Sequence, residues 1–130
     1  MKPPVYRLDP AAPRHATVVH ALQRNATVIG AHDGIAVEDR TLSYRAYAAA
    51  VAGLAHRLRA LGAGGQRVAV VMPNSLETAV ALLGAMAAGA QVAPVNPGFT
   101  DPEVLRALKD AEPRIILCRA DWAERARRLA

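Results

Sequence analysis

Three short apolar segments, spaced 23 residues apart, constrain the fold more than any other feature of the sequence. They start near residues 68, 91 and 114. The first, residues 68–72, is continuously apolar between a glycine pair and a proline, which is typical of a strand buried on both faces. Helical patterns fill the intervals, and helices between parallel strands form right-handed crossovers. The spacing predicts an α/β fold, a three-layer sandwich with a mostly parallel sheet and a βαβαβα core, with strands near 68–72, 92–95 and 114–118.

The helix before the first strand has the clearest apolar period. Ser43 can cap its start and Gly62 can close its end. Its apolar residues recur every three or four positions, which places them on one helical face. These residues are Tyr47, Val51, Leu54, Leu58 and Leu61.

Three further helices are predicted after it. The second begins at Ser75 and ends near Gly89, and its inner face is expected to carry Leu76, Ala79, Val80, Leu83, Met86, Ala87 and Ala90. The third begins with a capping box formed by Thr100 and Glu103. Asp121 and Glu124 open the last helix.

The chain before residue 43 carries weaker patterns. Residues 1–16 are rich in proline and have no apolar period, so we expect an irregular N-terminal arm there and one α/β subdomain over residues 17–130. Residues 17–25 are expected to form a short helix. Residues 35–37 and 41–44 flank a polar turn and predict a small hairpin.

Composition limits the classes of function. The 130 residues suit one domain or part of one, and their net charge of +5 comes from 14 arginines spread along a chain that also holds 29 alanines. Dispersed basic residues do not predict nucleic-acid binding. A single cysteine favours a reducing compartment, and no segment resembles a signal peptide or a membrane span. We therefore expect a cytoplasmic location.

Two loops are the candidate binding elements. In open α/β sheets ligands bind beyond the carboxyl ends of the strands, where residues 73–75 and 96–98 are expected to lie. Their amides, or the helix N-termini that follow, could hold a phosphate or carboxylate, in which case Asn74, Ser75, Asn96 and Thr100 would form the site. The same residues also suit turns that lead from strand to helix without any ligand.

Other motifs do not predict a catalytic, cofactor-binding or metal site in this chain. The glycines at 62–65 lead from helix to strand, whereas a phosphate loop leads from strand to helix. Cys118 ends an apolar strand and is interpreted as a structural thiol. The four histidines, His15, His20, His32 and His56, do not have the spacing of metal ligands. His32 and Asp33 could form an orienting pair, but no nucleophile accompanies them. The residues interpreted as a solvated helix face are Arg125, Arg127 and Arg128, with Asp121 and Glu124.

Four segments together resemble a known family in order and spacing. They are Leu-Ser-Tyr at 42–44, Arg-Val-Ala-Val-Val-Met-Pro-Asn-Ser at 67–75, Gly-Ala-Met-Ala-Ala-Gly-Ala-Gln-Val-Ala-Pro-Val-Asn-Pro at 84–97, and Ala-Glu-Pro-Arg-Ile-Ile-Leu-Cys at 111–118. Over roughly residues 17–118 the chain resembles the N-terminal segment of the AMP-forming acyl-CoA synthetases. The Pro-Val-Asn-Pro stretch is more similar to fatty-acyl and aryl-CoA ligases than to peptide-synthetase adenylation domains.

The resemblance implies an enzyme that uses ATP and Mg²⁺ to adenylate a carboxylate and then transfers the acyl group to coenzyme A. It also implies that the parts which bind these groups lie further along such enzymes, in a Ser/Thr/Gly-rich loop with a lysine, an aromatic-Gly-x-Thr-Glu segment, an aspartate for the ribose and a late lysine. None of these motifs occurs in this chain, whose only serines are Ser43 and Ser75. Ala46 also replaces the glutamate usual in the family after the capping residue.

The sequence therefore predicts an incomplete N-terminal subdomain of an adenylate-forming enzyme that is inactive alone and binds none of these cofactors by itself. Its partners would be the missing C-terminal part of the enzyme or a second copy of the chain. Two alternatives remain open. One is a non-enzymatic chain that associates with a partner through an unpaired sheet edge. The other is a small ligand-binding α/β domain that uses the two asparagine loops.

Overall fold

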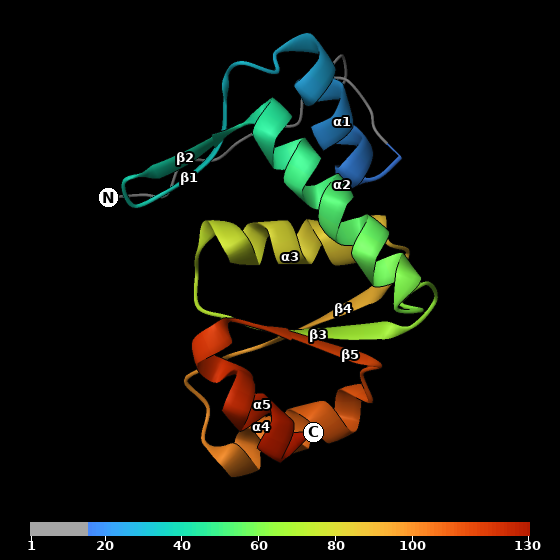
Figure 1. The fold of residues 1–130 in the computed structure, drawn as a ribbon, viewed down its shortest axis with the longest axis vertical. Coiled ribbons are helices and arrows are strands. Elements are labelled where there is room, and N and C mark those ends of the chain that lie inside the picture. The colour runs from blue at the N-terminus through green and yellow to red at the C-terminus, as the bar shows by residue number, and fades with distance from the viewer. Residues whose placement is uncertain (1–15) are drawn as a thin grey trace, which may run out of the picture.

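A three-stranded parallel sheet forms the middle layer of the structure, a computed structural model that describes residues 16–130 (Figure 1). The strands are β3 (Arg67–Val71), β4 (Gln91–Val95) and β5 (Ile115–Cys118), in the order β4-β3-β5. The predicted α/β fold and the three strands are confirmed. The arm predicted over residues 1–16 lies outside the described residues, apart from Ala16.

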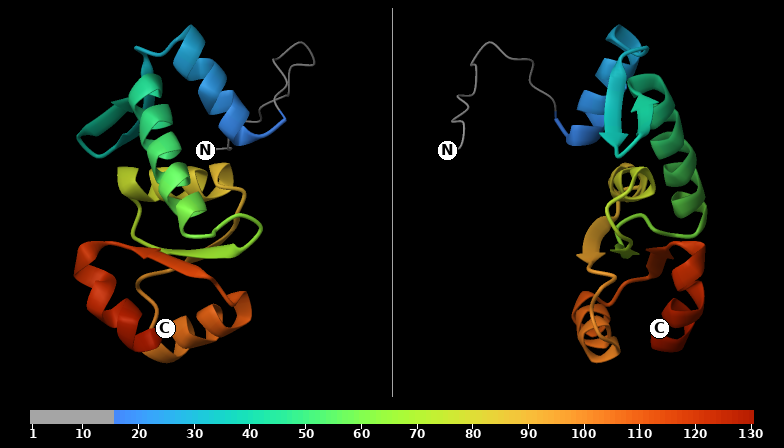
Figure 2. Two further views of the ribbon diagram at one scale, coloured as in Figure 1. Left: turned by 45° about the vertical axis from the view of Figure 1, so that its right-hand side comes forward. Right: turned by 90° about the vertical axis from the view of Figure 1, so that its left-hand side faces the viewer.

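Helices cover both faces of the sheet (Figure 2). On one face lies α3 (Leu76–Ala87), with α2 (Tyr44–Ala60) and α1 (Val18–Val28) stacked beyond it. On the other face lie α4 (Asp101–Ala111) and α5 (Ala123–Leu129). We call the first the α3 side and the second the α4 side.

Side chains of β3 alternate between two hydrophobic clusters. Val68 belongs to the cluster on the α3 side, while Ala69 and Val71 belong to the cluster on the α4 side, as the two-residue period of a strand requires. All three residues are at most 1% exposed. The α3 side is packed with small residues from helices and a loop, namely Ala55, Ala63, Ala85 and Ala88, and with Leu58. The α4 side is packed with Val95, Val104, Leu108 and Leu129.

The inner face predicted for the second helix, now α3, is only partly correct. The fully buried residues of α3 include Ala81, Gly84 and Ala85, because this helix lies between the sheet and α2 and is covered on two sides. Leu83 does pack inward, against the cluster formed by α1 and α2. Met86 is 45% exposed, which contradicts its predicted inner position.

The apolar face predicted for the first helix, now α2, is correct except at its last residue, Leu61. Ser43 caps α2 by accepting a hydrogen bond from the Ala46 N–H at 3.2 Å. Leu61 is 61% exposed, contrary to prediction, because it is the C-cap residue where the chain turns away from the core. Gly62 adopts φ +79°, a left-handed conformation that favours glycine and ends the helix as predicted.

The first helix and the first hairpin strand are longer than predicted, and the second hairpin strand is shifted by one residue. The helix α1 runs to Val28 from a Thr17 cap. The hairpin consists of β1 (Asp33–Val37) and β2 (Arg40–Ser43), paired antiparallel. Tyr44 belongs to α2 rather than to the hairpin, since Ser43 already caps the helix there. Near the C-terminus a 3₁₀ turn, η1 (Ala120–Trp122), precedes α5, so Asp121 lies in this turn rather than at the start of an α-helix.

The two outer strands present different free edges. The Gln91 N–H bonds to the Gln66 carbonyl, so along β4 the odd residues face β3 and Pro94 faces outward, where it offers no donor. The Arg114 N–H bonds to the Arg67 carbonyl, so Ile115 and Leu117 of β5 direct their N–H and C=O groups outward. The edge of β4 is therefore blunted by proline, and no strand of the described part of the chain pairs with the outer edge of β5.

Candidate functional site

The carboxyl ends of β3 and β4 form the candidate site. The chain leaves β3 toward α3 on one face of the sheet, and it leaves the neighbouring β4 toward α4 on the opposite face (Figure 1). Two adjacent strands whose following helices lie on opposite faces create a crevice between their ends, which is where open α/β sheets bind ligands.

A hollow of about 470 Å³ occupies this crevice. Its lining includes the predicted Asn74 and Asn96 with their neighbouring prolines, the ends of both strands and one side of α3. The other predicted residues of the site, Ser75 and Thr100, do not line it. The described residues that line it include no charged side chain. They are Val70, Met72, Pro73, Asn74, Thr78, Leu82, Pro94, Val95, Asn96 and Pro97. The surface is therefore apolar with a few amide and hydroxyl groups.

Hydroxyl groups close the N-terminus of α3 beside this hollow. Ser75 accepts a hydrogen bond from the Thr78 N–H at 3.1 Å, and the two hydroxyls are 3.0 Å apart. The Thr78 hydroxyl donates in turn to the Pro73 carbonyl. The Thr78 N–H, one of the first-turn donors of the helix, is therefore bonded by a side chain of the cap.

The second loop is folded by its own asparagine. The Asn96 side-chain oxygen accepts from the Gly98 N–H at 2.9 Å, and the Asn96 carbonyl accepts from the Phe99 N–H at 3.2 Å. This is the turn-forming role of asparagine. The predicted capping box follows, because Glu103 accepts from both the N–H and the hydroxyl of Thr100 at 2.8 Å. These hydrogen bonds lower the pKa of the Glu103 carboxyl.

Arg125 of α5 holds the loop between β4 and α4, and its prediction as part of a solvated face is wrong. Its guanidinium donates to Asp101 Oδ1 at 2.7 Å and to the Pro97 and Phe99 carbonyls at 3.2 and 2.6 Å. Arg128 donates to the other oxygen of Asp101 at 3.0 Å. Arg127 pairs with Glu124 on the exposed face, as expected. The two residues that form the main contact are 24 positions apart, and no local motif links them.

A second hollow, of about 670 Å³, lies between the ends of β3 and β5. Its rim carries two ion pairs, Arg40 with Glu77 at 2.8 Å and Arg119 with Asp121 at 3.2 Å. Cys118 lines it and is half-buried, and burial raises the pKa of its thiol. A raised pKa disfavours the thiolate, so the structural interpretation of this cysteine fits its surroundings.

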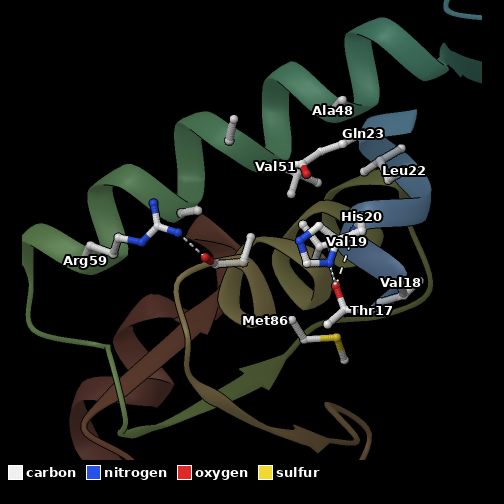
Figure 3. Close-up of a pocket in the computed structure, with 13 residues that line it drawn as sticks. Thr17, Val18, Val19, His20, Leu22, Gln23, Ala48, Val51, Arg59 and Met86 are labelled. Atoms are coloured by element: carbon white, nitrogen blue, oxygen red, sulfur yellow. Dashed lines mark hydrogen bonds between the residues drawn. The ribbon is translucent and has the colours of Figure 1, made fainter. Parts of the chain in front are cut away.

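A third hollow is an open groove of about 520 Å³ between α1, α2 and α3 (Figure 3). Apolar side chains such as Leu22 and Val51 form its floor, and Met86 lies at its rim. Arg59 donates to the Ala87 carbonyl and so caps the C-terminus of α3. The His20 ring forms a hydrogen bond with the Thr17 hydroxyl beside it, at 2.9 Å. These polar groups serve the helix ends around the groove.

The described residues contain no cluster of three or more histidine, cysteine, aspartate or glutamate side chains placed to hold a metal ion. His20, His32 and His56 lie apart on the surface of the described region, and His15 lies outside it. The glycines at 62–65 form the turn between α2 and β3, as predicted. Within residues 16–130 no helix combines the length and apolarity needed to cross a bilayer.

Comparison with known proteins gives a consistent set of relatives. The model of the family described as AMP-binding enzyme matches residues 18–130. The antimetabolite synthetase AmbB of Pseudomonas aeruginosa is 34% identical over 116 residues, 88% of this chain. Surfactin synthase subunit 1 of Bacillus subtilis is 32% identical over 78% of this chain. A solved structure of a putative long-chain-fatty-acid CoA ligase from Rhodopseudomonas palustris superimposes with a TM-score of 0.77 at 29% identity and covers 87% of this chain.

This chain spans only a small share of these relatives. The aligned region is 9% of AmbB, 3% of the surfactin synthase subunit and 29% of the palustris ligase chain.

Proposed function

Since the chain belongs to the family of AMP-binding enzymes, we propose that it contributes the N-terminal α/β part of an enzyme that activates a carboxylate with ATP to form an acyl-adenylate. The observation that carries this proposal is the family match over residues 18–130. The order of elements from the hairpin to α5 supports it, because the same fold occurs in the palustris ligase. Under this proposal residues 17–130 are one partial subdomain that follows an N-terminal arm of residues 1–16.

The acyl acceptor defines two candidate functions. Transfer to coenzyme A by a fatty-acyl or aryl-CoA ligase is supported by the Pro-Val-Asn-Pro stretch at 94–97 and by the name of the palustris relative. Aminoacyl adenylation in a nonribosomal peptide synthetase is supported by curated relatives such as the dimodular nonribosomal peptide synthase of Bacillus subtilis, 31% identical over 79% of this chain. Both share the adenylation step.

We propose that ATP and its Mg²⁺ are bound by residues outside this chain. A triphosphate requires cations and free backbone donors arranged around it. The hollow at β3 and β4 does not fit that requirement, since no charged side chain of the described residues lines it. An uncharged wall of this kind suits a neutral or apolar part of a ligand.

Calorimetry and an exchange assay test this proposal. At about 150 mM salt, where exposed charges are largely screened, the isolated chain should show no saturable, Mg²⁺-dependent ATP binding. It should also show no ATP–pyrophosphate exchange with fatty, aromatic or amino acids. Micromolar ATP binding that is lost in Asn74→Ala and Asn96→Ala variants would place a phosphate site in the hollow and overturn the proposal.

We further propose that the partner of this chain, whether the rest of an adenylate-forming enzyme or a second copy, pairs along the open edge of β5. The backbone groups of Ile115 and Leu117 that face outward have no partner within residues 16–130, whereas Pro94 blunts the edge of β4. Size-exclusion chromatography with light scattering should detect dimers or larger species at tens of micromolar. Leu117→Pro should reduce them, and Val92→Pro on the other edge should not. A monomer at that concentration would count against pairing between copies.

A further inference from the structure

Arg125 makes a set of contacts that only a guanidinium can make. Its Nε, Nη1 and Nη2 atoms each donate to a different oxygen, on Asp101, Pro97 and Phe99 respectively. The three acceptors lie along one loop of five residues, 97–101. An ammonium group has three donors on one atom and cannot reach acceptors that are spread in this way, whereas the planar fork of arginine can.

The surroundings hold the guanidinium in place. The Arg125 side chain is 26% exposed, and its charge lies 4.9 Å from the centre of the Trp122 ring. Arg128 binds the second oxygen of Asp101, so both carboxylate oxygens are engaged by α5. Asp101 is also the first residue of α4. The last helix is therefore joined to the start of α4 and to the loop before it.

This loop continues directly from one wall of the hollow. Pro97, whose carbonyl accepts from Arg125, lines the hollow next to Asn96. We propose that Arg125 is a positioning residue, which holds residues 97–101 in one conformation and thereby fixes the β4 wall of the site. The inference rests on the proposed function in that the hollow belongs to the site of an adenylate-forming enzyme. It assigns to α5 a role in shaping that site.

Hydrogen exchange of individual backbone amides tests this role. The N–H groups of Gly98 and Phe99 are bonded to Asn96 within the turn, so their exchange rates report whether the turn persists. In Arg125→Met both rates should rise at least tenfold relative to the parent, while amides of β3 keep their rates. Arg127→Met is the matched control, because Arg127 pairs with Glu124 on the exposed face of the same helix.

The lysine variant separates geometry from charge. Arg125→Lys keeps the positive charge but loses the fork, so it should behave like Arg125→Met at Gly98 and Phe99. Full rescue by lysine would mean that charge alone is needed and would overturn the proposal. Unchanged exchange in Arg125→Met, or a rise shared equally by β3, would also overturn it. If Arg125→Met does not fold, Asp101→Asn weakens the same contacts and should raise the same two rates. All these outcomes are independent of ATP binding, so they leave the proposed function to be tested by its own binding and exchange assays.

Discussion

The two faces of the sheet are stabilised in different ways. On the α3 side, small residues allow helices to stack in two layers, and Gly84 of α3 lies so close to Leu54 of α2 that an added Cβ would be 2.7 Å from its Cδ2 atom. On the α4 side, one helical layer covers the sheet, and Arg125 and Arg128 join α5 to α4 through Asp101.

This difference shows which parts of a fold depend on apolar pattern and which depend on polar geometry. Close packing between α2 and α3 should respond mainly to changes in side-chain volume. The contact between α5 and the loop should respond mainly to changes in donors, acceptors and protonation. Variants on the two sides can separate these contributions.

The largest effect is expected for Leu83→Asp on the α3 side. Leu83 is half-buried against the cluster of Leu22, Tyr47 and Val51, so a carboxylate there would lose part of its hydration without gaining a partner. We expect a loss of about 3 kcal/mol or more in the free energy of unfolding, measured by urea denaturation. The control is Leu105→Asp on α4, which is 46% exposed and should lose less than about 1 kcal/mol. Equal losses in the two variants would contradict the assignment of the buried face.

A smaller effect is expected for Gly84→Ala. The new methyl group would crowd the Leu54 side chain, whose Cγ and Cβ atoms would lie 3.0 and 3.1 Å away. Overpacking destabilises the protein by about 1–3 kcal/mol, and the higher helix propensity of alanine stabilises it by about 1 kcal/mol. We therefore expect a net loss of about 1 kcal/mol in the free energy of unfolding. Gly53 of α2 has nothing within 4 Å of an added Cβ.

Gly53→Ala is therefore the matched control and should stabilise the protein by about 0.5–1 kcal/mol. Thermal unfolding of the two variants measures the difference directly. A stabilising Gly84→Ala would show that α2 and α3 can separate without loss, which contradicts close packing as the basis of the α3 side.

Most of the fold was predictable because its signals are local. The apolar run of β3, the caps at Ser43 and Ser75, and the capping box at Thr100 each depend on neighbouring residues, and all are confirmed. The family match confirms the resemblance of the four segments. The errors at Leu61 and Met86 arise where a helix end or a second helix decides exposure, which apolar spacing alone does not specify.

The candidate site was predictable in position but not in detail. The rule that ligands bind beyond parallel strand ends placed the loops of Asn74 and Asn96 together, and the structure places both on one hollow. The contact between Arg125 and Asp101 was missed, because nothing in a single sequence distinguishes a structural arginine from the solvated arginines of the same helix.

Acidification should loosen the contact between α5 and the start of α4. Hydrogen bonds from Arg125 and then Arg128 lower the pKa of Asp101 below its usual value. A carboxylate whose pKa is lowered by folding adds stability above its unfolded pKa, about 3.9, and loses that contribution as pH falls through the lower folded value. Trp122 is the single tryptophan and contacts Arg125, so its emission should change over this acidic range.

Asp101→Asn is the control for this pH dependence. The pKa values of Glu77 and Glu103 are also lowered, and these two carboxyls are present in both proteins. The variant should therefore lose the part of the emission change that comes from Asp101 alone. Identical pH profiles for parent and variant would show that the Asp101 contact does not reach Trp122.

The smallest effect is expected for Trp122→Phe. The Trp122 indole N–H is buried and has no hydrogen-bond partner among the described residues, a situation that costs about 1–3 kcal/mol. Phenylalanine removes this donor and keeps an aromatic face beneath Arg125, but it also loses part of the apolar contact with Val104 and Leu129 in the same cluster. These opposing changes should leave the free energy of unfolding within about 1 kcal/mol of the parent. Trp122→Ala loses the ring altogether and should cost about 2 kcal/mol, since the residue is only half-buried. A loss in Trp122→Phe as large as that in Trp122→Ala would mean that the indole N–H is satisfied in solution, and that the α4 side depends on this donor as well as on the guanidinium of Arg125.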